Sequence, residues 1–420
     1  MAIQEMIAPE TARELVLGAV EPLGVEEVEL LQAVGRVVAQ DIASDIDISP
    51  FDHSAMDGFC MRAEQLTGAS EETPVELDVI AEVAAGDFYD GEIAPGQCVR
   101  IMTGAALPAA ADSVVKYEIV GIVSGDGKPG SRVSFTAPVE KGNNIRHAGE
   151  EAKKGEPVVK ADEVINTAGV GFLASCGAVK VPVFRRPKVA IIATGSELVD
   201  PSVVPGRGQI RNSNSYAMAA QAQAAGALPT VLPVCKDTFE GLCEAVQKAA
   251  ENFDFVVTTG GAANGDYDFI KKVVDELGEL MMVTVNMRPG KAQAFGLVNG
   301  TPVFGLPGNP AAAYCGFEVL IRPALRKMQG FAHFDRPQVK AHLTKDMRKK
   351  DPRRIYLRST LTKADDGSYQ VTPDKNQSSG SFGVLQHSTC LAIMPEGLES
   401  KKAGDVLDCV LMDVSEEVVL

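Results

Sequence analysis

Several signals that would place the chain outside a reduced, aqueous compartment are missing. The eight cysteines are scattered without any C-x-x-C pair, which is typical of reduced thiols rather than of a disulfide framework. The opening stretch MAIQEMIAPE lacks the basic-then-apolar order of a signal peptide. No apolar run reaches the roughly eighteen residues of a membrane span. We therefore expect a cytoplasmic protein without a membrane partner.

Positive charge is also scarce, because 40 lysines and arginines face 56 aspartates and glutamates, giving a net charge of -16. Such a field repels polyanions, so we expect no nucleic-acid partner. A small anion would need a local basic cluster to collect it. The five histidines form no zinc-type spacing with the cysteines. The chain also contains neither a P-loop nor an H-E-x-x-H motif, which argues against a P-loop NTPase and a zinc protease.

The chain does have the length and composition of a folded protein with several domains. Its 420 residues are 45% hydrophobic and 23% charged, and a length of this kind favours roughly two to four domains. Residues 185–328 alternate apolar runs typical of strands with helical spacings. The expected strands are 189–193, 230–234, 255–258, 282–286 and 303–306, and the expected helices are 213–225, 238–251, 268–277 and 310–328. This order predicts a mostly parallel sheet covered by helices on both faces.

The segments around this α/β region have a different character. Apolar residues at helical spacing predict an N-terminal helix around Ala12–Ala19, and Leu31, Val34 and Val38 repeat that spacing. Residues 52–139 contain short β-prone runs between glycine and proline turns, which favours an inserted β-rich module. A further helix is expected to begin near Ala161. Short β-runs after Arg336 predict a separate C-terminal β-barrel or sandwich.

Polar loops follow the strands of the α/β region. Ligands of open parallel sheets collect beyond the carboxyl ends of the strands, so these loops are expected to share one rim. The loops are 194–197, 236–237, 260–268, 288–291 and 306–310. The glycine-rich third loop is the most informative, because Gly260, Gly261 and Gly265 let backbone N–H groups approach a phosphate.

The side chains of these loops divide into two chemical sets. Glu197, Asp237, Asp266 and Asp268 are suited to Mg²⁺ or to ribose hydroxyls. The second set, Arg288 and Lys291, supplies fixed positive charge for an oxyanion or phosphate on the stiff turn Pro289-Gly290. Each loop taken alone also fits a plain surface turn or a helix cap.

The last rim loop, Leu306-Pro307-Gly308-Asn309-Pro310, predicts a helix N-terminus facing the same rim. Asn309 suits the N-cap and Pro310 the first helical position. Free N–H groups at that end would then favour an anion. Two loops outside the sheet, 50–59 and 100–105, are typical either of ligand-facing loops or of a hinge and a strand end.

Eight motifs together resemble one known family. They are FDHSAMDG (51–58), RIMTGA (100–105), NIRHAGEE (144–151), ATGSEL (193–198), QIRNSNS (209–215), TTGGAANGDYD (258–268), RPGK (288–291) and LPGNP (306–310). In order and at family-like intervals they resemble the molybdopterin molybdenumtransferases, to which the C-terminal domain of gephyrin is related. The resemblance spans essentially the whole chain.

The resemblance implies a multidomain α/β plus β fold in an elongated homodimer. Residues 1–51 and 141–180 would form a discontinuous N-terminal domain, and residues 52–140 an inserted β-rich domain. Residues 181–331 would form a three-layer α/β molybdopterin-binding domain with a parallel-dominated sheet, and residues 332–420 a C-terminal β-barrel. The site would lie between the α/β domain of one subunit and the inserted module of the other, which would explain the site-like loops at Asp57 and Thr103.

The resemblance also implies a reaction and roles for residues. Adenylylated molybdopterin and molybdate would react with Mg²⁺ present, releasing AMP and placing the metal on the dithiolene. No side-chain nucleophile is required, because the dithiolene sulfurs receive the metal. The implied catalytic residues are Asp57, Thr103, Glu197, Asp237, Asp268 and Lys291. The implied Mg²⁺ ligands are Asp268, Glu197 and Asp237.

The remaining implied residues bind the substrates. Those that would hold the pterin substrate are Gly260, Gly261, Gly265, Asp266, Arg288, Pro307, Gly308 and Asn309. Arg288 and Lys291 would attract molybdate, with Arg354, Arg358 and residues 378–381 as weaker candidates. A molybdopterin adenylyltransferase is a possible partner.

Four positions depart from the family pattern. Ala263, Asn264, Ala292 and Ala312 stand where valine, serine or proline is usual, which puts details of the ligand contacts in doubt. Two alternatives therefore stay open: a non-catalytic scaffold of the gephyrin type and an enzyme that handles tungstate. The persistence of the charged positions favours catalysis.

Overall fold

The computed structural model describes residues 3–235, 238–260 and 269–412. The chain divides into two compact units, which are described separately. The larger unit contains Met1–Glu26 and Phe184–Leu420, and the smaller unit contains Glu27–Val183. No helix of the described residues is long and apolar enough to cross a membrane.

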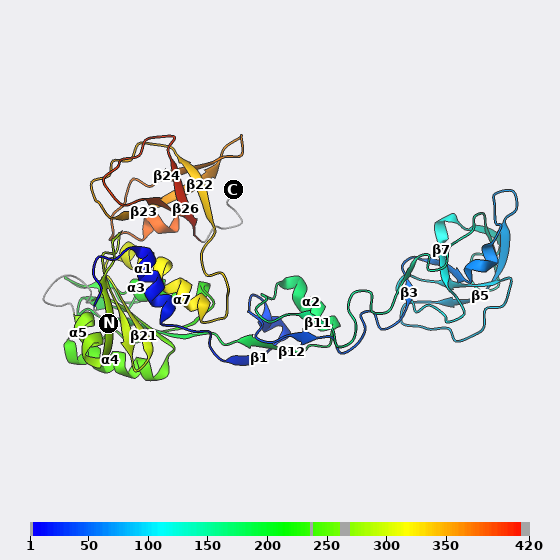
Figure 1. The fold of residues 1–420 in the computed structure, drawn as a ribbon, viewed down its shortest axis with the longest axis horizontal. Helices are drawn as coiled ribbons and strands as arrows, with labels where there is room; N and C mark the ends of the chain where they lie inside the picture. Colours follow the sequence, from blue (N-terminus) through cyan, green and yellow to red (C-terminus); the bar gives the residue numbers. More distant parts are fainter. Residues whose placement is uncertain (1–2, 236–237, 261–268, 413–420) are drawn as a thin grey trace. The chain divides into compact units, whose positions relative to one another are not determined.

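The larger unit is built on a six-stranded sheet (Figure 1). Its order is β16 (Leu228–Val231), β13 (Lys188–Ala193), β17 (Phe255–Thr259), β21 (Thr301–Leu306), β20 (Ala292–Val298) and β18 (Gly278–Thr284). The first four strands are parallel to one another, whereas β20 is antiparallel to both of its neighbours. The parallel-dominated sheet is thus confirmed, with one strand, β20, that the sequence analysis missed.

Helices cover both faces of this sheet (Figure 1). One face carries α4 (Phe239–Asn252) and α5 (Phe269–Leu277). The other carries α1 (Pro9–Gly18), α3 (Asn214–Ala224) and a continuous helical run of α6 (Pro310–Gly316), a π-helical segment (Phe317–Ile321) and α7 (Arg322–Lys327). Successive strand residues alternate between these faces, as Ile191 and Ile192 do, so the central strands β17 and β21 are almost wholly buried, whereas no position of the edge strand β16 is.

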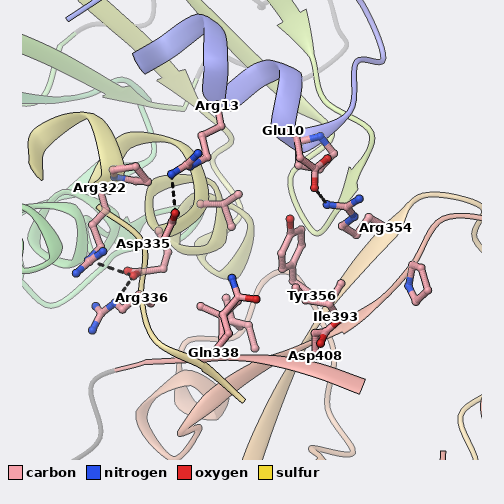
Figure 2. Close-up of a pocket in the computed structure, with 17 residues that line it drawn as sticks. Glu10, Arg13, Arg322, Asp335, Arg336, Gln338, Arg354, Tyr356, Ile393 and Asp408 are labelled. Atoms are coloured by element: carbon pink, nitrogen blue, oxygen red, sulfur yellow. Dashed lines mark hydrogen bonds and ion pairs between the residues drawn. The ribbon is translucent and has the colours of Figure 1, made fainter. Parts of the chain in front are cut away.

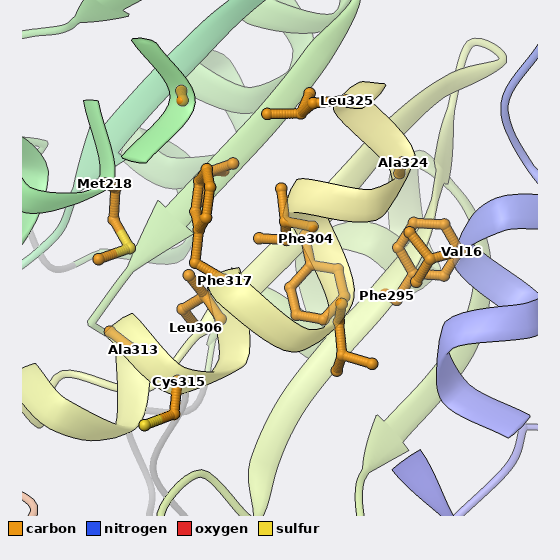
Figure 3. Packing of buried hydrophobic residues seen from close by; sticks show 14 of the residues in the cluster. Val16, Met218, Phe295, Phe304, Leu306, Ala313, Cys315, Phe317, Ala324 and Leu325 are labelled. Carbon is orange, nitrogen blue, oxygen red and sulfur yellow. The ribbon is translucent and has the colours of Figure 1, made fainter. Parts of the chain in front are cut away.

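The core on the α3 side consists of large apolar side chains from strands and helices. Figure 3 shows Phe295, Phe304 and Leu306 of the sheet packed against Phe317 and against Val16 of α1. The predicted N-terminal helix is confirmed as α1, which begins at Pro9. It packs against α7 and the π-helical segment, which is why the first 26 residues group with the larger unit. The four domain boundaries given above, including 1–51 for the discontinuous domain, stay a prediction.

The C-terminal part of the larger unit is a closed barrel rather than a sandwich. Its strands are β22 (Gln338–Leu343), β23 (Arg354–Lys363), β24 (Tyr369–Pro373), β25 (Cys390–Met394) and β26 (Val406–Leu411). Strand β23 pairs with both β24 and β25, which closes the ring. The short strand β19 (Met287–Arg288) adds in parallel to the start of β23. The 288–291 loop is therefore attached to the barrel through its backbone.

The remaining elements of the larger unit are short. They are the pair β14 (Leu198–Val199) and β15 (Ile210–Arg211) and the helix α8 (Gly383–Gln386).

The smaller unit contains the predicted β-rich module. Its six-stranded sheet has the order β7 (Ser113–Lys116), β4 (Gly58–Met61), β6 (Gln97–Ile101), β5 (Val75–Val83), β9 (Arg132–Phe135) and β8 (Gly121–Ser124). Two-stranded pairs are β2 (Ile42–Ala43) with β11 (Pro157–Val159), β3 (His53–Ser54) with β10 (Ile145–Arg146), and β1 (Val25–Glu29) with β12 (Lys180–Phe184). Short 3₁₀ turns are Leu30–Ala33, Ala63–Leu66 and Tyr117–Ile119.

Two helix predictions in the smaller unit were wrong. Only one 3₁₀ turn follows Glu29, because Leu31 is 82% exposed and Val38 forms a β-bridge to Val183 instead of lining a helix face. The helix expected near Ala161 begins six residues later, as α2 (Thr167–Ser175). Its start is set by Asn166, whose side chain accepts the Gly169 N–H at 2.8 Å.

Candidate functional site

A small pocket lies where strands β13, β17 and β21 end. It has a volume of about 90 Å³ and includes Thr194, Glu197, Asn214, Gly260 and Gly308 in its wall. Gly260 has φ +91°, and a Cβ there would lie 2.3 Å from the Thr194 carbonyl oxygen, so only glycine lets the two loops approach. We call this the rim pocket.

The polar groups of the rim pocket are tied to the neighbouring loops. The Asn214 amide donates to Thr259 Oγ1 and to the Gly308 carbonyl, both at 2.9 Å. Its Oδ1 is buried and has no partner among the described residues. Glu197 is exposed, and its carbonyl accepts the Ile210 N–H at 2.8 Å. Asn214 and Glu197 thus line the same small space, and neither the Asn214 Oδ1 nor the Glu197 carboxylate forms a hydrogen bond with the described residues.

Part of the predicted site lies outside the described residues. This holds for Asp237, Gly261, Gly265, Asp266 and Asp268, and for the departures Ala263 and Asn264. Their roles stay predictions. Within the residues that are described, no three histidine, cysteine or acidic side chains gather as metal ligands would.

A larger cleft of about 970 Å³ opens next to the rim pocket, between the 288–291 loop, the 307–309 turn and the barrel. We call it the basic cleft, because six cationic residues line it: Arg288, Lys291, Arg348, Lys350, Arg353 and Arg358. Gly308 lines both cavities, so they adjoin. The structure thus places Arg288, Lys291, Pro307, Gly308 and Asn309 together, as predicted from the rim loops.

Few of these cations are neutralised. Asp351 accepts from Arg353 and, at 3.2 Å, from Arg288, and the hydrogen bonds from Arg353 hold the pKa of the Asp351 carboxyl well below its usual range. The side chains of Lys291, Arg348 and Lys350 form no hydrogen bond or ion pair within the described ranges. The basic cleft therefore carries excess positive charge in a chain that is acidic as a whole.

Arg358 is the deepest cation of the basic cleft. Its side chain is only 1% exposed, and one guanidinium nitrogen donates to the Ser378 carbonyl at 3.1 Å. Its Nε has no partner, and no carboxylate of the described residues forms an ion pair with it. Burial lowers the pKa of Arg358. Buried charges in proteins are normally paired, so an anion bound in the cleft would supply the partner that this arginine lacks among the described residues.

The start of helix α6 differs from the prediction. Asn309 occupies the N-cap and Pro310 follows it, but the Asn309 side chain forms no capping hydrogen bond. The Ala311 N–H donates to the Ser379 carbonyl at 2.8 Å, so it is not free for a ligand. The anion-binding capacity of the cleft rests on side chains rather than on this helix end.

Asp57 and Thr103 are brought together in the smaller unit. The Asp57 carboxylate accepts both the backbone N–H and the hydroxyl of Thr103 at 2.7 Å. These bonds hold the pKa of Asp57 below its usual value. Asp57 directly precedes β4 and Thr103 follows β6, so adjacent strands of one sheet carry the pair.

The sequence analysis missed the barrel side of the basic cleft. Arg348, Lys350 and Arg353 come from the stretch KDMRKKDPRR (345–354), which holds six basic residues in a chain of net charge -16. This local excess of positive charge was the feature of the sequence that could have indicated this side of the cleft. Of the weaker candidates, Arg358 and Ser378 and Ser379 line the cleft, whereas Arg354 pairs with Glu10 and Glu396 outside it.

A second large cavity, of about 480 Å³, lies between α1, α7 and the barrel (Figure 2). Most of its charged side chains form ion pairs with one another, although Nε of Arg13 and of Arg354 has no hydrogen-bond partner among the described residues. Arg13 meets Asp335 at 2.7 Å, Arg354 meets Glu10, and the buried Glu318 accepts from Arg336 at 2.5 Å. This cavity has the character of a structural junction, and the basic cleft is the better anion site.

Comparison with known proteins identifies the class of protein. Three family models match consecutive parts of the chain: MoeA N-terminal region (domain I and II) over residues 7–177, probable molybdopterin binding domain over 190–327, and MoeA C-terminal region (domain IV) over 340–412. A molybdopterin biosynthesis protein from Pyrococcus horikoshii has the same fold, with a TM-score of 0.82 and 32% identity over 97% of this chain and 99% of that one.

Curated relatives give the family. A molybdopterin molybdenumtransferase of Staphylococcus aureus (strain COL) is 35% identical over 396 residues, covering 94% of this chain and 93% of the relative. A protein of the same name from Staphylococcus epidermidis is 36% identical over 400 residues, with the same coverage. The chain belongs to the molybdopterin molybdenumtransferase family.

Proposed function

We propose that the chain is a molybdopterin molybdotransferase of molybdenum cofactor biosynthesis. It inserts molybdate into adenylylated molybdopterin and releases AMP in a Mg²⁺-dependent reaction. Family membership supports the reaction class. The observation that carries the substrate assignment is Arg358, a cation at the basic cleft that is buried to 1% exposure and forms no ion pair with an acidic side chain of the described residues.

The chemistry of the basic cleft suits a tetrahedral dianion. Arginine forks and lysine ammonium groups bind oxyanions through charge-assisted hydrogen bonds. A volume of about 970 Å³ exceeds the needs of molybdate alone and falls in the range of sites for organic ligands. The cleft therefore has room for the oxyanion beside the dithiolene that receives it.

The rim pocket supports a role for Mg²⁺. Glu197 is the one carboxylate among the described residues of its wall. Mg²⁺ commonly keeps several waters and binds through one or two carboxylates together with substrate phosphates, so this donor set fits it. Glu197, with Asp237 and Asp268 as further candidates, would hold the ion, which when bound neutralises charge on the phosphoanhydride. The buried Asn214 Oδ1, which has no hydrogen-bond partner among the described residues, would accept from a water of the ion.

The other predicted residues complete the proposal. Gly261, Gly265 and Asp266 belong to the proposed pterin-phosphate loop. Arg288, Pro307 and Asn309 belong to the wall of the basic cleft, and Gly308 to the walls of both cavities. We assign the Asp57–Thr103 pair to the site of a second copy in a cytoplasmic homodimer. A molybdopterin adenylyltransferase would supply the adenylylated substrate.

The decisive experiment measures AMP release by the purified full chain from adenylylated molybdopterin. Release is expected with Mg²⁺ and molybdate together, and not when either is left out. Tungstate in place of molybdate tests which oxyanion the cleft prefers. Absence of any metal-dependent AMP release would overturn the enzymatic function and favour a scaffold.

A further inference from the structure

A buried glutamine lies directly beneath the 288–291 loop. Gln293, on strand β20, is fully buried, and its Nε2 donates to the Gly290 carbonyl at 2.5 Å and to Met287 Sδ at 3.1 Å. A side-chain amide has two donor hydrogens, and both are used here. Met287 precedes Arg288, and Gly290 precedes Lys291. One amide thus holds the loop at two points, next to each of its two cations.

The opposite side of the same amide is held by the helix beneath it. A Cβ at Gly316 of α6 would lie 2.5 Å from Gln293 Oε1 and 2.9 Å from Leu306 Cδ2. Glycine at position 316 therefore creates the space that the glutamine fills. Gln293 Oε1 has no hydrogen-bond partner within the described residues. Reversing the amide would place that oxygen against the Gly290 carbonyl, which is electrostatically unfavourable, so the orientation of the donor is set.

The loop is divided into a buried and an exposed half. Met287, Pro289 and Gly290 are buried, whereas Arg288 and Lys291 are exposed toward the basic cleft. Gln293 contacts only the buried half. Its hydrogen bonds therefore fix the backbone of the loop. The backbone in turn fixes the positions from which the Arg288 and Lys291 side chains extend.

We infer that Gln293 is a positioning residue for oxyanion binding, acting through the 288–291 loop, with Gly316 as its required neighbour. The inference rests on the proposed function and deepens it. Without the Nε2 donor, the buried Gly290 carbonyl loses its partner, and the loop relaxes away from its bound geometry. Displacing the two cations weakens their charge-assisted hydrogen bonds to an oxyanion, so the effect should appear in the affinity for molybdate.

The test uses a matched pair of buried glutamines. Gln293→Met keeps most of the side-chain volume and removes the donor, and Gly316→Ala displaces the amide while leaving it in the chain. The control is Gln329→Met. Gln329 is also buried, donates to the Ala225 and Leu325 carbonyls at 3.0 and 2.8 Å, and has its Oε1 2.5 Å from the position of a Cβ at Gly226. It does not line the basic cleft.

Three quantities are measured on each full-length variant: the Kd for molybdate, the KM and kcat of AMP release, and hydrogen exchange of the backbone amides of residues 286–292. For Gln293→Met and Gly316→Ala we expect Kd and KM to rise about tenfold, as the loss of one hydrogen bond would give. The kcat at saturating molybdate should change less than about twofold, because the loop binds rather than reacts. Exchange in the loop should accelerate in these two variants and stay unchanged in Gln329→Met.

A Gln293→Met variant with wild-type Kd and unchanged loop exchange would overturn the inference. Equal increases in Kd for Gln329→Met would also overturn it, since they would reflect general destabilisation. If Gln293→Met does not fold, Gln293→Asn, one methylene shorter, is subject to the same expectations. If the unmodified chain neither binds molybdate nor releases AMP, the proposed function fails, while loop exchange still decides whether Gln293 holds the loop.

Discussion

Replacing Arg358 with methionine should weaken molybdate binding without weakening the free protein. The guanidinium is 1% exposed, has an unpartnered Nε, and donates otherwise to the Ser378 carbonyl. Hydrogen bonds between a charged donor and an anion contribute about 1.5–3 kcal/mol, which corresponds to an increase in Kd of about 10- to 150-fold. Arg358→Lys keeps the charge but loses the planar fork, so its Kd should lie between the two.

Without ligand, Arg358→Met should not lower the stability of the protein. Methionine removes a buried charge that forms no ion pair with an acidic side chain in the described part of the chain, so the free energy of unfolding without ligand should stay the same or increase. Molybdate at 100 times the wild-type Kd should stabilise the unmodified chain by about 2.7 kcal/mol. With a Kd about 30-fold higher, the same concentration should stabilise the variant by only about 0.9 kcal/mol.

Isothermal titration calorimetry gives Kd, and urea unfolding with and without molybdate gives the two free energies. An Arg358→Met variant that binds molybdate with wild-type affinity would refute the reasoning. A variant that loses stability in the absence of ligand would show that the arginine is structural. Vanishing of the molybdate effect in both proteins would show that the basic cleft does not take this anion.

Three further predictions concern other charges. Lys291→Ala should raise the Kd for molybdate only about fivefold, because this lysine is exposed, and the difference should shrink in titrations at high salt; a change larger than that of Arg358→Met would contradict the assignment. Glu318→Ala should lower the free energy of unfolding in urea by about 3–5 kcal/mol, since it removes the buried carboxylate that pairs with the partly buried Arg322 and Arg336. As a control, Lys340→Ala removes an exposed ion pair and should lower the free energy of unfolding by less than about 1 kcal/mol. Equal decreases for Glu318→Ala and Lys340→Ala would refute the argument that burial makes the Glu318 ion pairs more important. Burial alone would raise the pKa of Asp254, but hydrogen bonds from Arg185 and a backbone amide lower it. The loss of unfolding free energy caused by Asp254→Asn should therefore be constant above about pH 5 and shrink below about pH 4. A loss that grows on acidification would contradict the lowered pKa.

Strand β20 shows where local patterns were present but not read. The hairpin between β20 and β21 turns at Asn299-Gly300, and both residues have positive φ. This dipeptide is a strong hairpin signal. The segment before it, however, begins directly after the 288–291 loop, which had been interpreted only as a rim loop. One strand was therefore missed, and the sheet is mixed rather than parallel throughout.

The barrel shows where local patterns could not decide. Its five strands were recognisable as β-runs, but a barrel and a sandwich have the same alternation along each strand. The choice depends on β23 pairing with both β24 and β25. That pairing depends on contacts between segments distant in sequence, which period-two spacing does not encode.

One side of the candidate site was predicted from the sequence and the other was not. Arg288, Lys291 and the 306–310 turn were predicted to meet because carboxyl ends of parallel strands share an edge. The barrel side of the cleft was not predicted, since nothing in the stretch 345–354 says which element it will face. It reaches the cleft through the parallel pairing of β19 with β23.

The sequence alone therefore determined the reaction class and most of the order of elements, because motifs, loop residues and short-range periodicity are local properties of the chain. The tertiary structure alone decided which charges are paired. Arg354 and Arg358 lie four residues apart on one strand, yet Arg354 meets Glu10 and Glu396 while Arg358 is buried at the cleft without a carboxylate. Whether a cation is neutralised or left for a ligand depends on which distant segments pack around it.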